Sequence, residues 1–222
     1  MSEASSPSLP FIEVGASRED ADLCVILMHG LGADGHDFEE VAKMLCDAAA
    51  PRRWRLVLPH APVMRVTVNM GMSMPAWYDI LDLSLTREVD WETVGKSQKH
   101  IESIIENEPA SKIILAGFSQ GAAMALHVGL RHQDRISGIL AMSGYLLQSA
   151  EHPVPPSEGQ IPIRILHGNA DEVVPIKAAD LALHSLRQAG YSPDFKSYIA
   201  LGHSVSQEEI RDVFEWLRSQ DG

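Results

Sequence analysis

The stretch KIILAGFSQGAAMALHVGL, residues 112–130, decides the fold. Its first half is a continuous apolar run of the kind that forms a buried strand, and its second half is a helix-forming run. At the junction, GFSQG places Ser119 on a sharp strand-to-helix turn between Gly117 and Gly121. Small residues there let strand and helix pass closely, so the Ser119 hydroxyl is expected to project from the sheet end. Taken alone, the pattern is equally compatible with a chance glycine turn.

Other apolar runs repeat this alternation along the chain, which is typical of a mostly parallel sheet with crossover helices. Buried strands are predicted at 23–28, 55–59, 112–118, 138–144 and 163–168, and a strand nearer the sheet edge at 194–200. Helices are predicted at 38–49, 91–107, 121–132, 177–189 and 206–219. The predicted fold class is α/β, a three-layer sandwich with a mostly parallel central sheet and helices on both faces.

The chain of 222 residues suits one domain, since domains average about 150 residues and single α/β domains run longer. Hydrophobic residues make up 45% of the sequence, which is enough for a core. We predict a loose tail over residues 1–8 and one domain over residues 9–222. Residues 61–90 fit neither the strand nor the helix pattern and are expected to form a long excursion over the sheet end that carries Ser119.

Charge and cysteine content exclude several classes of protein. The net charge of −12 disfavours binding to nucleic acid and to anionic membrane surfaces. No window reaches the roughly 20 apolar residues of a membrane helix, so stable membrane insertion is not expected. Cys24 and Cys46 are the only cysteines, and a chain with a full core needs no disulfide. A cytoplasmic protein with reduced thiols is therefore expected.

A serine nucleophile needs a base and an acid, which in this fold follow in the order Ser, acid, His. The stretch IRILHGNADEVVP puts Asp171 in the loop after a predicted strand, although such aspartates usually serve only the turn. LGHSV puts His203 in the turn before the last helix. Asp194 is the rival acid, but it precedes its strand and would lie at the wrong end of the sheet. Ser119, Asp171 and His203 are therefore the predicted catalytic residues.

An oxyanion hole needs two N–H donors. The N–H of Gln120, next to the nucleophile, is the first, and the glycine-rich turn HGLGADG after an early strand offers the Leu31 N–H as the second. His29 and Gly30 are interpreted as shaping this turn only. His36 and His167 are interpreted as structural loop residues, because no Cys or acidic partner stands at ligand spacing. Neither a metal nor a cofactor is predicted.

Five blocks, in order, resemble the phospholipase/carboxylesterase family of α/β-hydrolases, which includes bacterial carboxylesterases and eukaryotic acyl-protein thioesterases. They are HGLGADGHDF, LPHAPVMRVTVNMGMSMPAWYDI, GFSQGAAMAL, HGNADEVVP and GHSV, and the resemblance spans nearly the whole chain, from Val25 to His203. The resemblance implies the α/β-hydrolase fold and the same triad and oxyanion donors, and it implies that Met74 and Trp77 lie beside an acyl-binding groove. Residues 64–74 fall in a stretch that differs among relatives with different acyl-chain preferences, so the resemblance does not decide the substrate. Met64 and Met70 could line the groove or fill the core.

The predicted function is a serine hydrolase that cleaves carboxylic esters or thioesters of small to medium apolar acyl groups through an acyl-enzyme on Ser119. One alternative is a long-chain acyl-protein thioesterase or lysophospholipase, which would need a deeper apolar groove. Another is a ligand-binding member without hydrolytic activity, against which the intact Ser, Asp and His argue. The expected partner is a small-molecule ester or thioester, and a homodimer is compatible with the resemblance although no residue pattern decides it.

Overall fold

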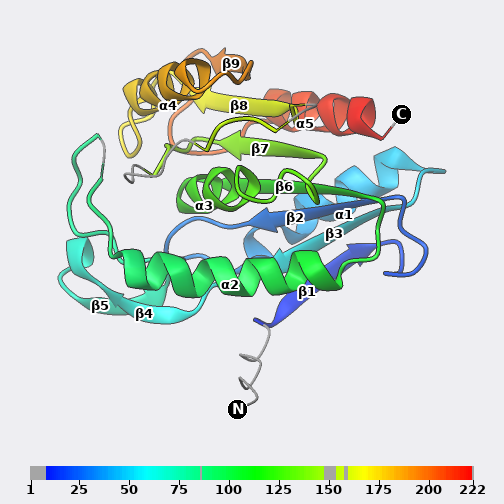
Figure 1. Ribbon diagram of the computed structural model, residues 1–222, viewed down its shortest axis with the longest axis horizontal. Coiled ribbons are helices and arrows are strands. Elements are labelled where there is room, and N and C mark those ends of the chain that lie inside the picture. The colour runs from blue at the N-terminus through cyan, green and yellow to red at the C-terminus, as the bar shows by residue number, and fades with distance from the viewer. Residues whose placement is uncertain (1–8, 86, 148–153, 158–159, 222) are drawn as a thin grey trace.

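The computed structural model describes residues 9–85, 87–147, 154–157 and 160–221. The tail predicted at residues 1–8 lies outside them. Within the described residues, seven strands form one sheet in the order β1-β3-β2-β6-β7-β8-β9 (Figure 1). The strands are β1 (Phe11–Gly15), β2 (Leu23–Met28), β3 (Trp54–Pro59), β6 (Lys112–Phe118), β7 (Gly138–Met142), β8 (Ile163–Gly168) and β9 (Asp194–Tyr198). β1 pairs antiparallel with β3, and all other neighbouring strands of this sheet pair in parallel.

Helices cover both faces of this sheet. In the described residues they are α1 (Glu39–Ala49), α2 (Trp91–Asn107), α3 (Gln120–Gly129), α4 (Ile176–Gln188) and α5 (Gln207–Gln220). One core cluster joins α2, α3 and α4 to the sheet, and a second joins α1 and α5 to its other face. Figure 1 shows α2 and α3 in front of the strands. The structure thus confirms the predicted three-layer α/β sandwich.

The strand sequences explain the two cores. In β2 all six residues are buried, and alternate side chains point to opposite faces. Val25 and Leu27 join the core beneath α1 and α5, whereas Ile26 and Met28 join the core beneath α2 and α3. A strand with helices on both faces therefore requires the continuous apolar run from which it was predicted.

Two elements differ from the prediction. β1 was not predicted, because its sequence FIEVG alternates exposed and half-buried residues at the sheet edge. Residues 61–90 contain a hairpin of β4 (Val63–Val66) and β5 (Met72–Pro75), with a short 3₁₀ helix, Thr67–Asn69, between them. Figure 1 shows this hairpin on the side toward which the arrowheads of β2, β7 and β8 point.

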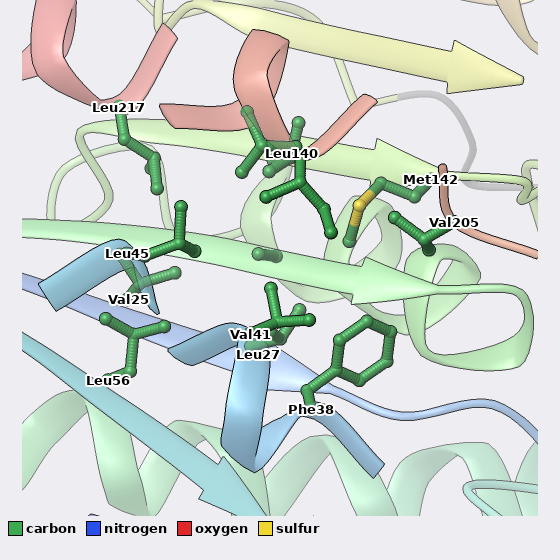
Figure 2. A pocket seen from close by; sticks show the side chains of 13 residues that line it. Val25, Leu27, Phe38, Val41, Leu45, Leu56, Leu140, Met142, Val205 and Leu217 are labelled. Atoms are coloured by element: carbon green, nitrogen blue, oxygen red, sulfur yellow. The ribbon is translucent and has the colours of Figure 1, made fainter. Parts of the chain in front are cut away.

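A small cavity lies inside the second core. It has a volume of about 20 Å³, and apolar side chains of the sheet, α1 and α5 line it (Figure 2). Phe38 is one of them, and its ring packs 6.1 Å from the ring of Phe118 on the neighbouring strand end. The space is about the size of one water molecule and offers it no polar partner, so it is a packing gap and not a ligand site.

Candidate active site

Ser119 occupies the turn between β6 and α3. Its φ of 55° lies in the left-handed region, which is costly for a residue other than glycine and is typical of a nucleophile turn. The two glycines are required by contact: a Cβ on Gly117 would lie 2.2 Å from the Gly121 backbone, and one on Gly121 would lie 2.2 Å from the Met28 carbonyl oxygen. The Ser119 N–H donates to the carbonyl of Met142 at 2.9 Å, which ties the turn to β7.

The three residues predicted as a triad lie in one hydrogen-bonded chain. The Ser119 Oγ is 2.9 Å from His203 Nε2, and His203 Nδ1 is 2.7 Å from Asp171 Oδ2. Asp171 follows β8 and His203 follows β9, so the side chains meet at the carboxyl ends of parallel strands. The His203 ring also packs 4.8 Å from the Phe118 ring, which limits its rotation. A carboxylate only accepts hydrogen bonds, so the imidazole proton sits on Nδ1 and leaves Nε2 free to accept from Ser119.

The Asp171 carboxylate is fixed by its own loop. Its Oδ1 accepts the N–H groups of Val173 and Val174 at 2.9 and 2.8 Å, and its side chain has no exposed surface. His167, expected in a loop, instead lies buried in β8, with Nε2 2.7 Å from the Val174 carbonyl oxygen. Burial lowers the pKa of His167, which favours a neutral ring that donates this hydrogen bond. His167 therefore supports the loop that orients Asp171.

Asp194, the rival acid, lies elsewhere. It begins β9, where it is exposed and forms an ion pair with Arg164 at the opposite end of the sheet from Ser119. This placement agrees with the reason for rejecting it, because the amino end of a parallel strand lies far from the carboxyl ends of its neighbours.

The two expected oxyanion donors face the same cavity as Ser119. Leu31 and Gln120 both line it, and no hydrogen bond within the described residues uses the N–H of Leu31. The Gln120 N–H opens α3, where the first backbone N–H groups have no partner in the helix. Both N–H groups thus belong to residues that line the cavity with Ser119, and no hydrogen bond within the described residues engages either of them.

His29 fixes the peptide that carries the Leu31 N–H. Its Nε2 accepts the N–H of Ala61 at 3.1 Å, so Nδ1 carries the proton and donates to the Gly30 carbonyl oxygen at 2.8 Å. Burial lowers the pKa of His29, which keeps the ring neutral as this pattern requires. In a trans peptide the C=O and the next N–H point in opposite directions. Holding the Gly30 carbonyl therefore directs the Leu31 N–H away from His29.

Trp77 differs from its expected place beside the acyl groove. It is fully buried and is not among the residues lining the cavity. Its indole N–H donates to the His29 carbonyl oxygen at 2.8 Å, and its backbone N–H donates to Gln120 Oε1 at 2.8 Å. A buried indole N–H needs an acceptor, and here that acceptor lies in the core. Trp77 thus connects the nucleophile turn to the loop that carries Leu31.

The methionines of the excursion also lie away from the cavity lining. Met74 is half-buried, and its sulfur is 3.1 Å from the side-chain amide of Asn69, which does line the cavity. Met70 is 87% exposed and adopts a left-handed φ of 56° in the hairpin, so it neither fills the core nor lines the groove. The expected acyl-binding role of Met74 would therefore be indirect, through Asn69.

The cavity in front of Ser119 has a volume of about 610 Å³. The excursion contributes one wall, with Val68, Asn69, Ile80, Leu83 and Arg87. Tyr145 and the loop after Asp171 also line the cavity, and both contact Arg87. Sequence reasoning missed Arg87 and Tyr145, because neither belongs to a motif. The arrangement combines a serine hydroxyl hydrogen-bonded to an imidazole with a largely apolar cavity, which are features that acyl transfer requires.

The described residues contain no group of three or more His, Cys, Asp or Glu side chains that could hold a metal ion. Within the same ranges, no helix is long and apolar enough to cross a membrane.

Comparison with known proteins gives the family. The family model described as Phospholipase/Carboxylesterase matches residues 9–220. Acyl-protein thioesterase 1 of Gibberella zeae is 37% identical, with 95% of each chain covered, and that of Neurospora crassa is 36% identical, with 94% of this chain and 90% of the relative covered. The crystal structure of Zea mays acyl-protein thioesterase 2 superposes with a TM-score of 0.84 at 27% identity, covering 96% of this chain and 99% of that one. The chain therefore belongs to the phospholipase/carboxylesterase family of α/β-hydrolases.

Proposed function

We propose that this chain hydrolyses carboxylic esters or thioesters of small to medium apolar acyl groups through an acyl-enzyme on the Ser119 oxygen. Family membership already makes the chain an ester or thioester hydrolase. What we propose beyond family membership is which residues catalyse the reaction and how large the acyl group is. The observation that carries it is the continuous hydrogen-bonded chain from Asp171 through His203 to Ser119, with distances of 2.7 and 2.9 Å.

The reaction proceeds in two halves. His203 Nε2 takes the Ser119 proton while the oxygen attacks the acyl carbon, and Asp171 keeps the imidazole in the required tautomer and stabilises its protonated form. His203 then gives the proton to the departing alcohol or thiol, leaving the acyl group on Ser119. Water, deprotonated by His203, attacks the acyl carbon, and the released Ser119 oxygen takes the proton back. Both halves thus use the same base.

The N–H groups of Leu31 and Gln120 stabilise the oxyanion that forms in each half-reaction. They come from a loop and a helix start held together by buried hydrogen bonds of Gln120 and Trp77. Each donor of this kind contributes a factor of about 10² to 10³ in kcat. Donors fixed before the substrate arrives need no reorganisation during the reaction, which is why rigid backbone N–H groups suit this role.

The cavity supports the proposed acyl size. Val68, Ile80 and Leu83 supply apolar wall, and each buried methylene contributes about 0.8 kcal/mol. The rate should therefore rise with acyl length until the chain reaches the polar part of the cavity at Arg87. Hydrolysis of long-chain acyl-protein thioesters is the second candidate function, favoured by the names of the two fungal relatives. It would need a path for the acyl chain past Arg87.

We also propose a reducing compartment such as the cytoplasm. Cys24 and Cys46 are both free thiols, and Cys24 is buried in β2. Thiols persist in this form where glutathione and thioredoxin keep them reduced.

Labelling with a fluorophosphonate probe tests the nucleophile. The wild type should react at Ser119, and Ser119→Ala should lose both the labelling and nearly all hydrolysis of p-nitrophenyl butyrate. A length series of p-nitrophenyl esters beside the matching acyl thioesters then separates the two candidate functions. Unlabelled wild type, or labelling that persists in Ser119→Ala, would contradict the proposal, while an optimum at palmitoyl thioester would favour the second candidate.

A further inference from the structure

Arg87 places a positive charge inside the active-site cavity. The residue is only 9% exposed and lines the same cavity as Ser119 and His203. Its Nη2 donates to the Val173 carbonyl oxygen at 2.8 Å, and its guanidinium carbon lies 4.8 Å from the centre of the Tyr145 ring. These contacts fix the position of the guanidinium, but neither supplies a negative charge.

Arg87 forms no ion pair in the described part of the chain, and Asp82 interacts with its charge only at longer range. There, no carboxylate oxygen lies within 4.0 Å of its guanidinium. Arg55 gives the contrast, because it is similarly buried yet pairs with both Glu13 and Glu108. Burying a charge without a partner is costly. A buried arginine that serves the fold is paired here, whereas the one in the cavity is not.

The acidic residues that line the cavity do not change this conclusion. Asp37 and Glu172 both contribute to the lining, but both are exposed and therefore solvated. Within the described residues, the only side-chain hydrogen bond of the Arg87 guanidinium is the one from Nη2 to Val173. Its remaining N–H groups are therefore left for a ligand.

We propose that Arg87 binds an anionic group, a carboxylate or a phosphate, that the substrate carries beside its scissile ester or thioester. The inference rests on the proposed function, since Ser119 must attack the same molecule. A guanidinium suits the task because its planar N–H groups can donate two parallel hydrogen bonds to a carboxylate or phosphate. The anion can belong to the acyl group, as in a monoester of a dicarboxylic acid, or to the leaving group, as in a phosphorylated alcohol.

The overall charge of the protein predicts the opposite preference. At a net charge of −12, the surface repels an anionic substrate. Without a specific site, the anionic member of a matched substrate pair should therefore react more slowly than the neutral one. A preference for the anionic member would for that reason identify a local cation.

Matched substrate pairs test the proposal in two arms. In the acyl arm, p-nitrophenyl monoesters of adipic and suberic acid are compared with p-nitrophenyl hexanoate and octanoate. In the leaving-group arm, 4-(butyryloxy)phenyl phosphate is compared with phenyl butyrate. We expect the wild-type kcat/KM to favour the anionic member in one arm, which identifies the source of the anion. In that arm Arg87→Gln should lower the anionic-to-neutral ratio about 30-fold, roughly 2 kcal/mol, the size of a hydrogen bond to a charged group.

Arg65→Gln is the matched control. Arg65 lies in the same excursion, is exposed, and donates to the Gly71 carbonyl oxygen outside the cavity. The Arg65→Gln substitution removes the same charge as Arg87→Gln and should leave the anionic-to-neutral ratio of kcat/KM unchanged. Arg87→Lys keeps the charge without the planar fork and should retain part of the preference. If Arg87→Gln does not fold, the proposal is tested by comparing the anionic-to-neutral ratio of the wild type with that of Arg87→Lys. A lower ratio in Arg87→Lys supports the proposal, and an unchanged ratio contradicts it.

The outcomes distinguish the inference from the proposed function. A wild type that favours the neutral member in both arms would overturn the role of Arg87, as would an equal change of the ratio in Arg87→Gln and Arg65→Gln. Neutral esters that are cleaved through Ser119 without any anionic preference would refute this inference alone. Neutral esters that are not cleaved, or are cleaved equally by Ser119→Ala, would refute the proposed function itself.

Discussion

A single imidazole, His29, determines the direction of the Leu31 N–H through the Gly30 carbonyl. His29→Ala removes both side-chain hydrogen bonds and leaves the Ala61 N–H without its acceptor. We expect kcat for p-nitrophenyl butyrate to fall about 10²-fold, the scale of one oxyanion donor, with little change in KM. Steady-state kinetics with a melting curve for each variant checks this.

His36→Ala serves as the control for His29. His36 lies in the same loop region but is exposed, and within the described residues its side chain contacts Glu39 and the ring of His60. Its removal should leave kcat unchanged. A loss of activity in His29→Ala that merely follows its loss of folded protein, with KM and kcat both altered, would argue against a role in orienting the donor.

Asp171→Asn tests the acid of the proposed triad. The amide oxygen can still accept the Val173 and Val174 N–H groups, so the loop should keep its conformation. The imidazole, however, loses the carboxylate that selects its tautomer, and kcat should fall by on the order of 10⁴. Asp194→Asn, at the other sheet end, should change kcat little. A larger loss in Asp194→Asn than in Asp171→Asn would reverse the assignment of the acid.

At the scale of elements, the crossing of β2 and α3 depends on one missing side chain. Gly121→Ala would bring a methyl group to 2.2 Å from the Met28 carbonyl oxygen, so strand and helix must separate. We expect a loss of about 1–3 kcal/mol in the free energy of unfolding, typical of overpacking, together with a marked fall in kcat because Ser119 moves. Urea denaturation and kinetics measure the two effects.

Gly95→Ala is the control for Gly121→Ala, because it adds a methyl group to a helix where there is space for it. Gly95 lies inside α2, and a Cβ there would meet no atom within 4 Å. Alanine should therefore stabilise the helix by about 0.5–1 kcal/mol without touching the reaction. Similar losses in both variants would show that the effect of Gly121→Ala reflects helix propensity and not the close approach.

The elements that the sequence predicts best are those buried on both sides or regularly amphipathic. β6, β8 and α2 have their predicted bounds, because continuous apolar runs and a 3.6-residue period are local signals. β1 has no such signal, since it is a half-exposed edge strand. The hairpin at residues 63–75 was also missed, because its pairing depends on contacts across the excursion.

The site also contains residues that the sequence predicts and residues that it does not. The positions of Ser119, Asp171 and His203 after their strands could be predicted from the chain order alone, although their catalytic roles stay predictions. Trp77 could not be placed, because its direction depends on the His29 carbonyl, 48 residues away. Arg87 could not be recognised either, since its acceptor on Val173 lies 86 residues away.

For the molecule as a whole, Glu209 links stability to pH. Both carboxylate oxygens are buried without a hydrogen-bond partner in the described residues. Burial raises the pKa of Glu209 from 4.5 to about 7, with Asp212 adding to the shift. Between these values the folded state holds a proton that the unfolded state has lost, so stability should fall as pH rises through this window. The full difference is about 3 kcal/mol.

Glu209→Gln removes the titration. Relative to the wild type, it should raise the free energy of unfolding by up to about 3 kcal/mol at pH 8 and much less at pH 5, because glutamine resembles the protonated acid. Urea denaturation at both pH values measures this. Glu215→Gln, exposed on the same helix, should have little effect at either pH. A wild type whose stability does not change between the two pH values would contradict the shifted pKa.

The strand order of the sheet also has a consequence during synthesis on the ribosome. From β6 onward the sheet grows in chain order, and His203 follows Ser119 by 84 residues. At bacterial and eukaryotic elongation rates of about 5–20 residues per second, the proposed nucleophile emerges roughly 4 to 17 seconds before the proposed base. Throughout that interval Ser119 is an ordinary alcohol. A nascent chain arrested before residue 203 should therefore not react with a fluorophosphonate, whereas the released chain should, so that labelling reports the arrival of His203 at the site.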